Sequence, residues 1–163
     1  MTATVAPVVP VAPMRVGIDT VEVAGVAAAL AAFGRRYEER LFTAGERAAA
    51  RRVDGACAER YAARFAAKEA VLKALDAGEA GVDWRDIEVE GGAGRPPSLT
   101  LHGRAAALAA AAGVRAWALS LSHDGTQACA MVAAWCGTDA PPLMTAGAGA
   151  AIPDFQFPSR HDH

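Results

Sequence analysis

A long, alanine-rich helix is the feature that most limits how this chain can fold. Helix-forming residues run from about 56 to 77, and Lys68, Glu69 and Lys73 are set there among alanines and large apolar residues. A helix of this composition is expected to be mostly buried. On a helical wheel Glu69 lies at the border of the apolar stripe, half withdrawn from water. It is either one half of an i, i+4 ion pair with Lys73 or a metal ligand.

Strands and helices alternate along the rest of the chain in an order typical of an α+β domain. The predicted elements are strands over 14–18, 86–90, 98–101, 117–123 and 127–135, and further helices over 21–33, 44–52 and 104–112. Asp19 and Thr20 are expected to end the first strand. Thr43 and Glu46 form a capping box at the start of the second helix. This order predicts an antiparallel sheet packed with the long central helix.

Length and charge limit the class of protein. The 163 residues suffice for one domain, which we place at 14–136 between a flexible extension over 1–13 and a Gly/Ala/Pro-rich tail over 137–163. A net charge of −2 argues against nucleic acid or an anionic membrane as the main partner. No stretch approaches the ~20 apolar residues of a membrane-spanning helix, and no signal peptide is expected. Three cysteines without CxxC spacing favour a reducing, cytoplasmic compartment.

A second carboxylate, Asp19, follows the first predicted strand and pairs with Glu69 in a candidate magnesium site. Such sites commonly use one or two protein carboxylates, and water and substrate phosphates complete the octahedron. Lys68 and Lys73 are expected to face the anion, which suits a phosphate ester as substrate. Taken alone, Asp19 is more readily explained as the N-cap of the next helix.

Two turns carry further candidates. Gly94, Arg95 and Pro96 form a turn whose glycine lets the backbone approach a ligand and whose arginine can pair with phosphate. On its own this is only a hairpin turn. His123 precedes an Asp-Gly dipeptide typical of a type I′ turn, so it is expected at the tip of the last hairpin. It is either a hydrogen-bonded structural residue or a ligand contact.

In combination, these pieces resemble the holo-acyl-carrier-protein synthase group of 4′-phosphopantetheinyl transferases. The matching pieces, in the family's order and separation, are Gly17-Ile18-Asp19, residues 64–70 with Lys73, Gly94-Arg95-Pro96, and residues 120–123. The resemblance spans roughly 14–135. It implies a compact α+β fold that forms a homotrimer, with Asp19 and Glu69 from one subunit and His123 from its neighbour in each active site.

The resemblance also implies an activity. The enzyme would use Mg²⁺ to transfer the 4′-phosphopantetheine group of coenzyme A to a serine of an apo acyl, polyketide or peptidyl carrier protein, releasing adenosine 3′,5′-bisphosphate. Asp19 and Glu69 would hold the metal, Glu69 would take the serine proton directly or through water, and Lys73 would pair with the pyrophosphate. The residues expected at the coenzyme A site are Arg64, Lys68, Lys73, Gly94, Arg95, Pro96 and His123, with Arg64 and His123 on the 3′-phosphate and Arg95 and Pro96 beside the adenosine.

One position departs from the family. Relatives often carry a basic residue six positions after the motif aspartate, where it helps to dock the carrier protein, but Ala24 and Gly25 stand in that neighbourhood here. Arg35, Arg36 and Arg40 could supply the positive face instead, although such clusters are commonly just solvated. Two other functions stay open. One is a non-catalytic coenzyme A or carrier-protein binding module, and the other is a metal-dependent phosphohydrolase acting on coenzyme A.

Overall fold

The computed structural model of the chain describes residues 13–51, 56–78, 80–92 and 95–137. In chain order the elements are β1 (Met14–Glu22), α1 (Val23–Phe33), α2 (Arg35–Leu41), α3 (Ala44–Ala50), α4 (Cys57–Ala74), the 3₁₀ turn η1 (Trp84–Asp86), β2 (Ile87–Gly92), β3 (Arg95–Leu101), α5 (Gly103–Ala111), β4 (Val114–His123) and β5 (Gln127–Cys136).

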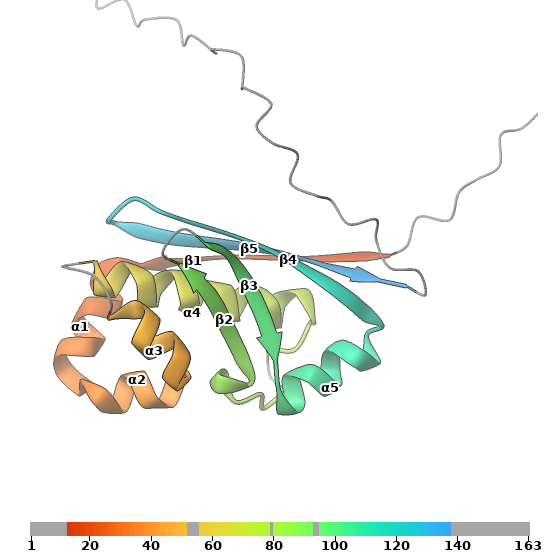
Figure 1. The fold of residues 1–163 in the computed structure, drawn as a ribbon, viewed down its shortest axis with the longest axis horizontal. Helices are drawn as coiled ribbons and strands as arrows, with labels where there is room; N and C mark the ends of the chain where they lie inside the picture. The colour runs from red at the N-terminus through yellow and green to blue at the C-terminus, as the bar shows by residue number, and fades with distance from the viewer. Residues whose placement is uncertain (1–12, 52–55, 79, 93–94, 138–163) are drawn as a thin grey trace, which may run out of the picture.

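Two antiparallel sheets organise these elements. The larger sheet has the strand order β1-β5-β4, and β2 pairs with β3 in a sheet of their own. In the larger sheet Asp19 lies opposite Ala130, and His123 lies opposite Ala128. Figure 1 shows this sheet as one layer, with α4 directly beneath it and the other helices beyond α4. The predicted fold class, antiparallel strands around a long central helix, is confirmed.

Helix α4 packs against the larger sheet through small side chains. The fully buried residues in this part of the core are Ala66, Ala67, Ala70 and Val71 on α4 and Ala130 and Val132 on β5. Alternate residues of β5 point inward, as the period of a strand requires. Because most of these side chains are single methyl groups, helix and sheet lie close together. The backbone of α4 therefore sets where each neighbouring strand residue can lie.

The other face of the larger sheet is apolar, and none of the described residues covers it. Met14, Val16 and Ile18 on β1 and Met131 on β5 are each between 47% and 58% exposed. Ile18 lies directly opposite Met131, so the side chains of the two strands form one continuous strip, which we call the exposed sheet face. Apolar surface gathered in this way is typical of a contact surface.

The structure corrects the predicted start of the domain. β1 does not end at Asp19 and Thr20 but continues to Glu22, because these residues stay paired with β5. Asp19 is therefore a strand residue, and Glu22 occupies the N-cap position of α1. The prediction that the helix begins at Val21 was two residues early, and the short helix α2 was not predicted.

The capping box at the start of α3 is confirmed. The backbone N–H of Glu46 donates to Oγ1 of Thr43 at 3.2 Å, and the backbone N–H of Thr43 donates to Oε2 of Glu46 at 2.8 Å. The helix ends at Ala50, earlier than predicted. The predicted extension and tail, 1–13 and 137–163, lie almost entirely outside the described residues and stay predictions. Among the described helices, none combines the length and the hydropathy needed to span a membrane.

Candidate active site

Asp19, Glu69 and Lys73 lie together where β1 crosses α4. The Nζ of Lys73 donates to Oδ1 of Asp19 at 2.5 Å and to the carbonyl oxygen of Ile18 at 3.2 Å. Glu69 lies one turn before Lys73 on α4, and the charges of Asp19 and Lys73 both act on its carboxylate. The fold thus brings two acids and one base into a single cluster from segments that are far apart in the sequence.

The electrostatics of this cluster favour an added cation. Burial is the main cause that raises the pKa of Glu69 above its usual value, and the negative charge of Asp19 adds to the rise. The positive charge of Lys73 lowers the pKa of Glu69. The hydrogen bond to Asp19 raises the pKa of Lys73 itself. A positive charge placed beside Glu69 would stabilise its ionised form.

The donor set fits a magnesium ion. Carboxylate oxygens are hard ligands of the kind that Mg²⁺ prefers, and two of them suffice when water and substrate phosphates fill the other positions. In the part of the chain that the structure describes, no group of three or more His, Cys, Asp or Glu is placed to hold a metal. A magnesium site here would therefore rest on Asp19 and Glu69 and keep open positions for a substrate.

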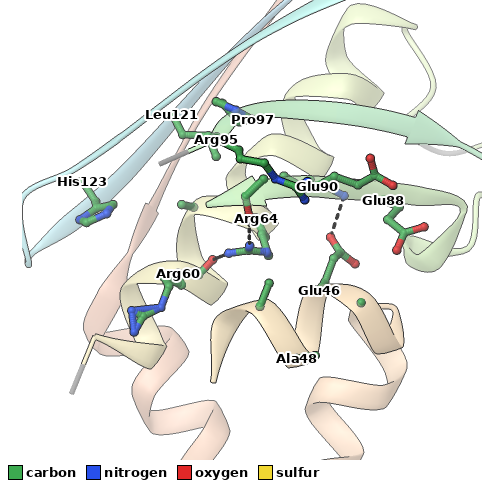
Figure 2. Close-up of a pocket in the computed structure, with 15 residues that line it drawn as sticks. Glu46, Ala48, Arg60, Arg64, Glu88, Glu90, Arg95, Pro97, Leu121 and His123 are labelled. Carbon is green, nitrogen blue, oxygen red and sulfur yellow. Dashed lines mark hydrogen bonds between the residues drawn. The ribbon is translucent and has the colours of Figure 1, made fainter. Parts of the chain in front are cut away.

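A separate pocket of about 1000 Å³ opens beside the N-terminal half of α4. Figure 2 shows Arg60 and Arg64 on α4, Arg95 on β3 and His123 on β4 around it. Basic groups from three elements converge there, so this basic wall suits an anionic ligand such as a phosphate. Its lining residues do not include the cluster of acids and lysine on β1 and α4.

Three glutamates also line the pocket, and two of them, Glu46 and Glu88, already accept hydrogen bonds. Glu46 is fully buried. Glu88 accepts a hydrogen bond from Oγ1 of Thr43 at 2.7 Å and lies 3.0 Å from Nε2 of His102. These contacts, the one from Thr43 first, hold the pKa of Glu88 below its usual value. Only Glu90 is exposed, so the basic wall sets the preference of the pocket.

Arg64 is a buried cation whose orientation is fixed by the backbone. Its side chain donates from Nη1 to the carbonyl oxygen of Arg60 at 3.1 Å and from Nη2 to that of Gly91 at 3.3 Å. The Nε has no hydrogen-bond partner among the described residues, and burial lowers the pKa of the guanidinium. A buried donor without a partner calls for an acceptor, and a phosphate oxygen in the pocket fits that need.

His123 reaches the pocket from the end of β4, as predicted for a hairpin tip. Its Nδ1 lies 2.8 Å from Oε2 of Glu59 in the first turn of α4, which ties the hairpin to the helix. The turn that follows is not the predicted type I′ turn at Asp124 and Gly125, because Asp124 does not have the positive φ that such a turn requires and its backbone N–H donates to the carbonyl oxygen of Gln127 at 3.1 Å. Asp124 shapes it by accepting the backbone N–H groups of Thr126 and Gln127 at 3.0 and 2.9 Å.

Lys68 lies in the core, which contradicts the expectation that it faces the anion. Its fully buried ammonium donates to Oε2 of Glu46 at 2.9 Å, to the carbonyl oxygen of Trp84 at 2.8 Å and to that of Ile87. These three acceptors use all of its N–H donors. Burial lowers the pKa of Lys68, and the charge of Glu46 acts against this shift.

The predicted Gly94-Arg95-Pro96 turn is wrong for two of its residues, because Arg95 and Pro96 lie in β3. Arg95 lines the pocket, whereas Gly94 lies outside the described residues. Pro96 is exposed, and the proline that lines the pocket is Pro97. The predicted contact of Pro96 with the adenosine stays a prediction.

Sequence reasoning missed Arg60 and Glu59. Arg60 lies four residues before Arg64, so the two share one face of α4, and this spacing could have indicated a second arginine at the pocket. No sequence pattern of this kind could have indicated Glu59. Its contact with His123 depends on how the hairpin packs on the helix.

Comparisons with known sequences agree with this arrangement. The sequence profile of the 4′-phosphopantetheinyl transferase superfamily matches residues 15–133. A holo-[acyl-carrier-protein] synthase of Frankia casuarinae is 50% identical over 123 residues, which cover 76% of this chain and 98% of the relative. A protein of the same name from Desulforudis audaxviator is 46% identical over 121 residues, covering 74% of this chain and 92% of the relative.

Solved structures agree as well. The Chronobacterium ammoniagenes ACPS-CoA complex superposes with a TM-score of 0.67 at 32% identity, over 77% of this chain and 99% of that one. The Helicobacter pylori holo-[acyl-carrier-protein] synthase in complex with coenzyme A gives a TM-score of 0.63 at 26% identity, over 73% and 98%. The chain therefore belongs to the 4′-phosphopantetheinyl transferase superfamily, in its holo-[acyl-carrier-protein] synthase family.

Proposed function

We propose that this protein transfers the 4′-phosphopantetheine group of coenzyme A to a serine of an apo acyl carrier protein and releases adenosine 3′,5′-bisphosphate. The observation that carries the proposal is the cluster of Asp19, Glu69 and Lys73, which places two carboxylates and a cation at one accessible point of a chain of this family. Phosphoryl transfer needs mainly positioning and neutralisation of charge, and this cluster provides both.

In the reaction the serine oxygen attacks the phosphorus that carries pantetheine, and the bond from that phosphorus to the oxygen of the adenosine 5′-phosphate breaks. Mg²⁺ held by Asp19 and Glu69 would supply charge neutralisation on the pyrophosphate. Glu69 accepts the serine proton, directly or through a water, and its raised pKa suits a general base. Lys73 turns its ammonium to the pyrophosphate and stabilises the charge that the leaving group gains.

The basic pocket holds the nucleotide end of coenzyme A in this proposal. Arg64 and His123 bind the 3′-phosphate, and Arg95 lies beside the adenosine. Support comes from the unpartnered Nε of Arg64 and from the convergence of the three basic residues on one pocket. The pantetheine arm would leave this pocket toward Asp19 and Glu69.

We infer that the working unit is a homotrimer with shared sites. The exposed sheet face supports contact between subunits, because it is a continuous apolar strip. The basic pocket and the Asp19 cluster do not share one pocket in the single chain, which supports a site completed by a neighbour. Asp19 and Glu69 of one subunit would then meet His123 of the next.

The carrier protein would dock beside this site. Helix α1 has no charged residue, and Ala24 and Gly25 are exposed on it. The exposed arginines that follow on α2 are Arg35, Arg36 and Arg40. We therefore assign the basic contact with an acidic carrier to α2. We place the reaction in the cytoplasm, with fatty acid, polyketide and peptide carriers as candidates, and the three free cysteines suit a reducing compartment.

Mass spectrometry of an apo carrier protein incubated with the enzyme, coenzyme A and Mg²⁺ tests the proposal. The expected result is a carrier modified by one phosphopantetheine group, and EDTA should abolish it. Release of the bisphosphate without a carrier would instead indicate a phosphohydrolase. Binding of coenzyme A without either product, across fatty acid, polyketide and peptide carriers, would indicate a non-catalytic binding module.

A further inference from the structure

Strand β1 crosses α4 at Gly17 with no side chain between the two backbones. A Cβ atom added to Gly17 would lie 1.9 Å from the carbonyl oxygen of Ala70, and 2.9 Å from both the carbonyl carbon of Ala70 and the backbone nitrogen of Ala74. All three atoms belong to the backbone of α4. No change of a neighbouring rotamer can therefore make room for even a methyl group.

The need for glycine at this position comes from space and not from backbone conformation. Gly17 is absent from the glycines of positive φ and lies within the regular pairing of β1, opposite Val132 on β5. Any residue could adopt this strand conformation. What an alanine could not do is keep the strand at its present distance from the helix.

The close contact lies between the two halves of the metal pair. Gly17 and Asp19 share the face of β1 that points to α4, and Ala70 directly follows Glu69. Two polar contacts flank the crossing: Nη1 of Arg15 donates to the carbonyl oxygen of Ala74 at 3.4 Å, and Lys73 donates to that of Ile18 at 3.2 Å. The separation of Asp19 from Glu69 is therefore set by how close β1 lies to α4.

We propose that Gly17 is a positioning residue that sets the distance between the carboxylates of Asp19 and Glu69 and thereby the affinity of the site for a divalent cation. The inference rests on the proposed function only in taking these two residues as the metal pair. A methyl group at position 17 pushes the strand, with Asp19, away from the helix that holds Glu69. Octahedral coordination by Mg²⁺ tolerates little change in the placement of its ligands.

Binding of Mn²⁺, measured by electron paramagnetic resonance on the full chain, tests the proposal without relying on catalysis. Gly17→Ala is expected to raise the dissociation constant for Mn²⁺ by about tenfold or more, the size of effect seen when residues that orient metal ligands are changed. Gly25→Ala is the matched control, since a Cβ at Gly25 meets nothing within 4 Å. It should leave the dissociation constant unchanged.

A second control separates positioning from general loss of stability. Leu108→Ala, on α5, removes a side chain packed against the core from an element that contributes nothing to the metal pair. It should lower the Tm and leave Mn²⁺ binding intact. If Gly17→Ala also lowers only the Tm, with an unchanged dissociation constant, the proposal is overturned.

A third variant covers the case in which Gly17→Ala does not fold. Asp19→Glu keeps the charge and the ligand type but lengthens the side chain by one methylene, so a fixed separation predicts a similar loss of Mn²⁺ affinity. Binding equal to wild type would overturn the proposal. A wild-type protein that binds no Mn²⁺ would instead refute the metal pair itself, so the two failures are distinguishable.

Discussion

Glu46 and Lys68 form an ion pair in which neither side chain is exposed, with Nζ of Lys68 2.9 Å from Oε2 of Glu46. The other carboxylate oxygen accepts the backbone N–H of Val89 at 3.0 Å, and Glu46 also closes the capping box of α3. The pair thus ties α3 and β2 to the helix that carries Glu69. Removing one partner of such a pair leaves an uncompensated charge in the core.

Lys68→Met is expected to lower the free energy of unfolding by about 3–5 kcal/mol, because it leaves Glu46 buried without its cation. Lys73→Met makes the same chemical change on the same helix, where the side chain is 54% exposed. It should change the free energy of unfolding far less than Lys68→Met does, because an exposed ion pair contributes little to stability. Urea denaturation followed by circular dichroism measures both.

Lys68→Met should cause the larger loss of stability, but Lys73→Met should cause the larger loss of activity in the transfer assay. Lys73→Met is expected to lower kcat by roughly 100-fold or more, because the leaving group loses its cation. Lys68→Met should keep a larger share of kcat under conditions in which it stays folded. Equal losses of stability in the two variants would contradict the structural role of Lys68.

Glu69→Gln is expected to remove most of the activity while stabilising the metal-free protein at neutral pH. Glutamine keeps the shape of the side chain but cannot accept the serine proton, and loss of a general base costs roughly 100-fold or more in kcat. The gain in stability follows from the raised pKa of Glu69, since burial and Asp19 make ionisation harder in the folded chain than in the unfolded chain.

The raised pKa of Glu69 also predicts how the difference in stability between wild type and Glu69→Gln changes with pH. Below the ordinary value of 4.5 both side chains are neutral, so wild type and Glu69→Gln should be similarly stable. As the pH rises from there through the raised pKa, wild type loses stability that the variant keeps. Thermal unfolding with EDTA across this range measures the difference. A variant less stable than wild type at neutral pH would contradict burial as the cause.

Much of the fold could be predicted because its elements are marked by local signals. The capping box of Thr43 and Glu46 and the alternation along the last hairpin are each decided within a few residues. The end of β1 is not decided by residues close by in the sequence. Asp19 and Thr20 favour turns, and only pairing with Ala130 and Cys129, far along the chain, keeps them in the strand.

The candidate site divides in the same way. The order of the motifs led us to expect Asp19, Glu69 and Lys73 at one site, and the structure places them together. Lys68 shows the limit, because two neighbouring charges on one helix carry no local mark of which is buried. Its burial depends on α3 placing Glu46 against α4, a contact between segments that no short pattern reports.

His123→Ala is expected to lower kcat/KM for coenzyme A, and the loss should come only from the missing contact with the 3′-phosphate. In wild type, replacing coenzyme A by 3′-dephospho-coenzyme A should lower kcat/KM, because Arg64 and His123 lose their acceptor. In the variant, the same replacement should lower kcat/KM by a factor at least about ten times smaller than in wild type. The reason is that a charge-assisted hydrogen bond contributes ~1.5–3 kcal/mol. Steady-state kinetics with both substrates measures this preference.

His102→Ala is the matched control for that measurement. This histidine lies outside the pocket and contacts Glu88. The variant should keep the full preference for coenzyme A over the dephospho compound. A His123→Ala enzyme with the same preference as wild type would remove His123 from the phosphate site.

Met131→Glu is expected to dissociate the proposed trimer, because it puts a charge in the centre of the exposed sheet face. Phe33→Glu is the control: Phe33 is a 65% exposed apolar residue on α1, away from that face. Size-exclusion chromatography with light scattering should show the mass of one chain for the first variant and of three chains for the second and for wild type. Three-chain assembly of Met131→Glu would place the subunit contact elsewhere.

Chains carrying Asp19→Ala and chains carrying His123→Ala should restore activity to each other when they are co-expressed and purified as mixed trimers. Each variant alone lacks one half of every site. In a mixed trimer of either composition, only one of the three subunit junctions joins an intact Asp19 to an intact His123, so about a third of the sites should be intact. Activity near a third of wild type, measured on trimers selected with two affinity tags, supports the shared site. If both halves came from one chain, no mixed trimer would contain an intact site, and activity would stay at the level of the single variants.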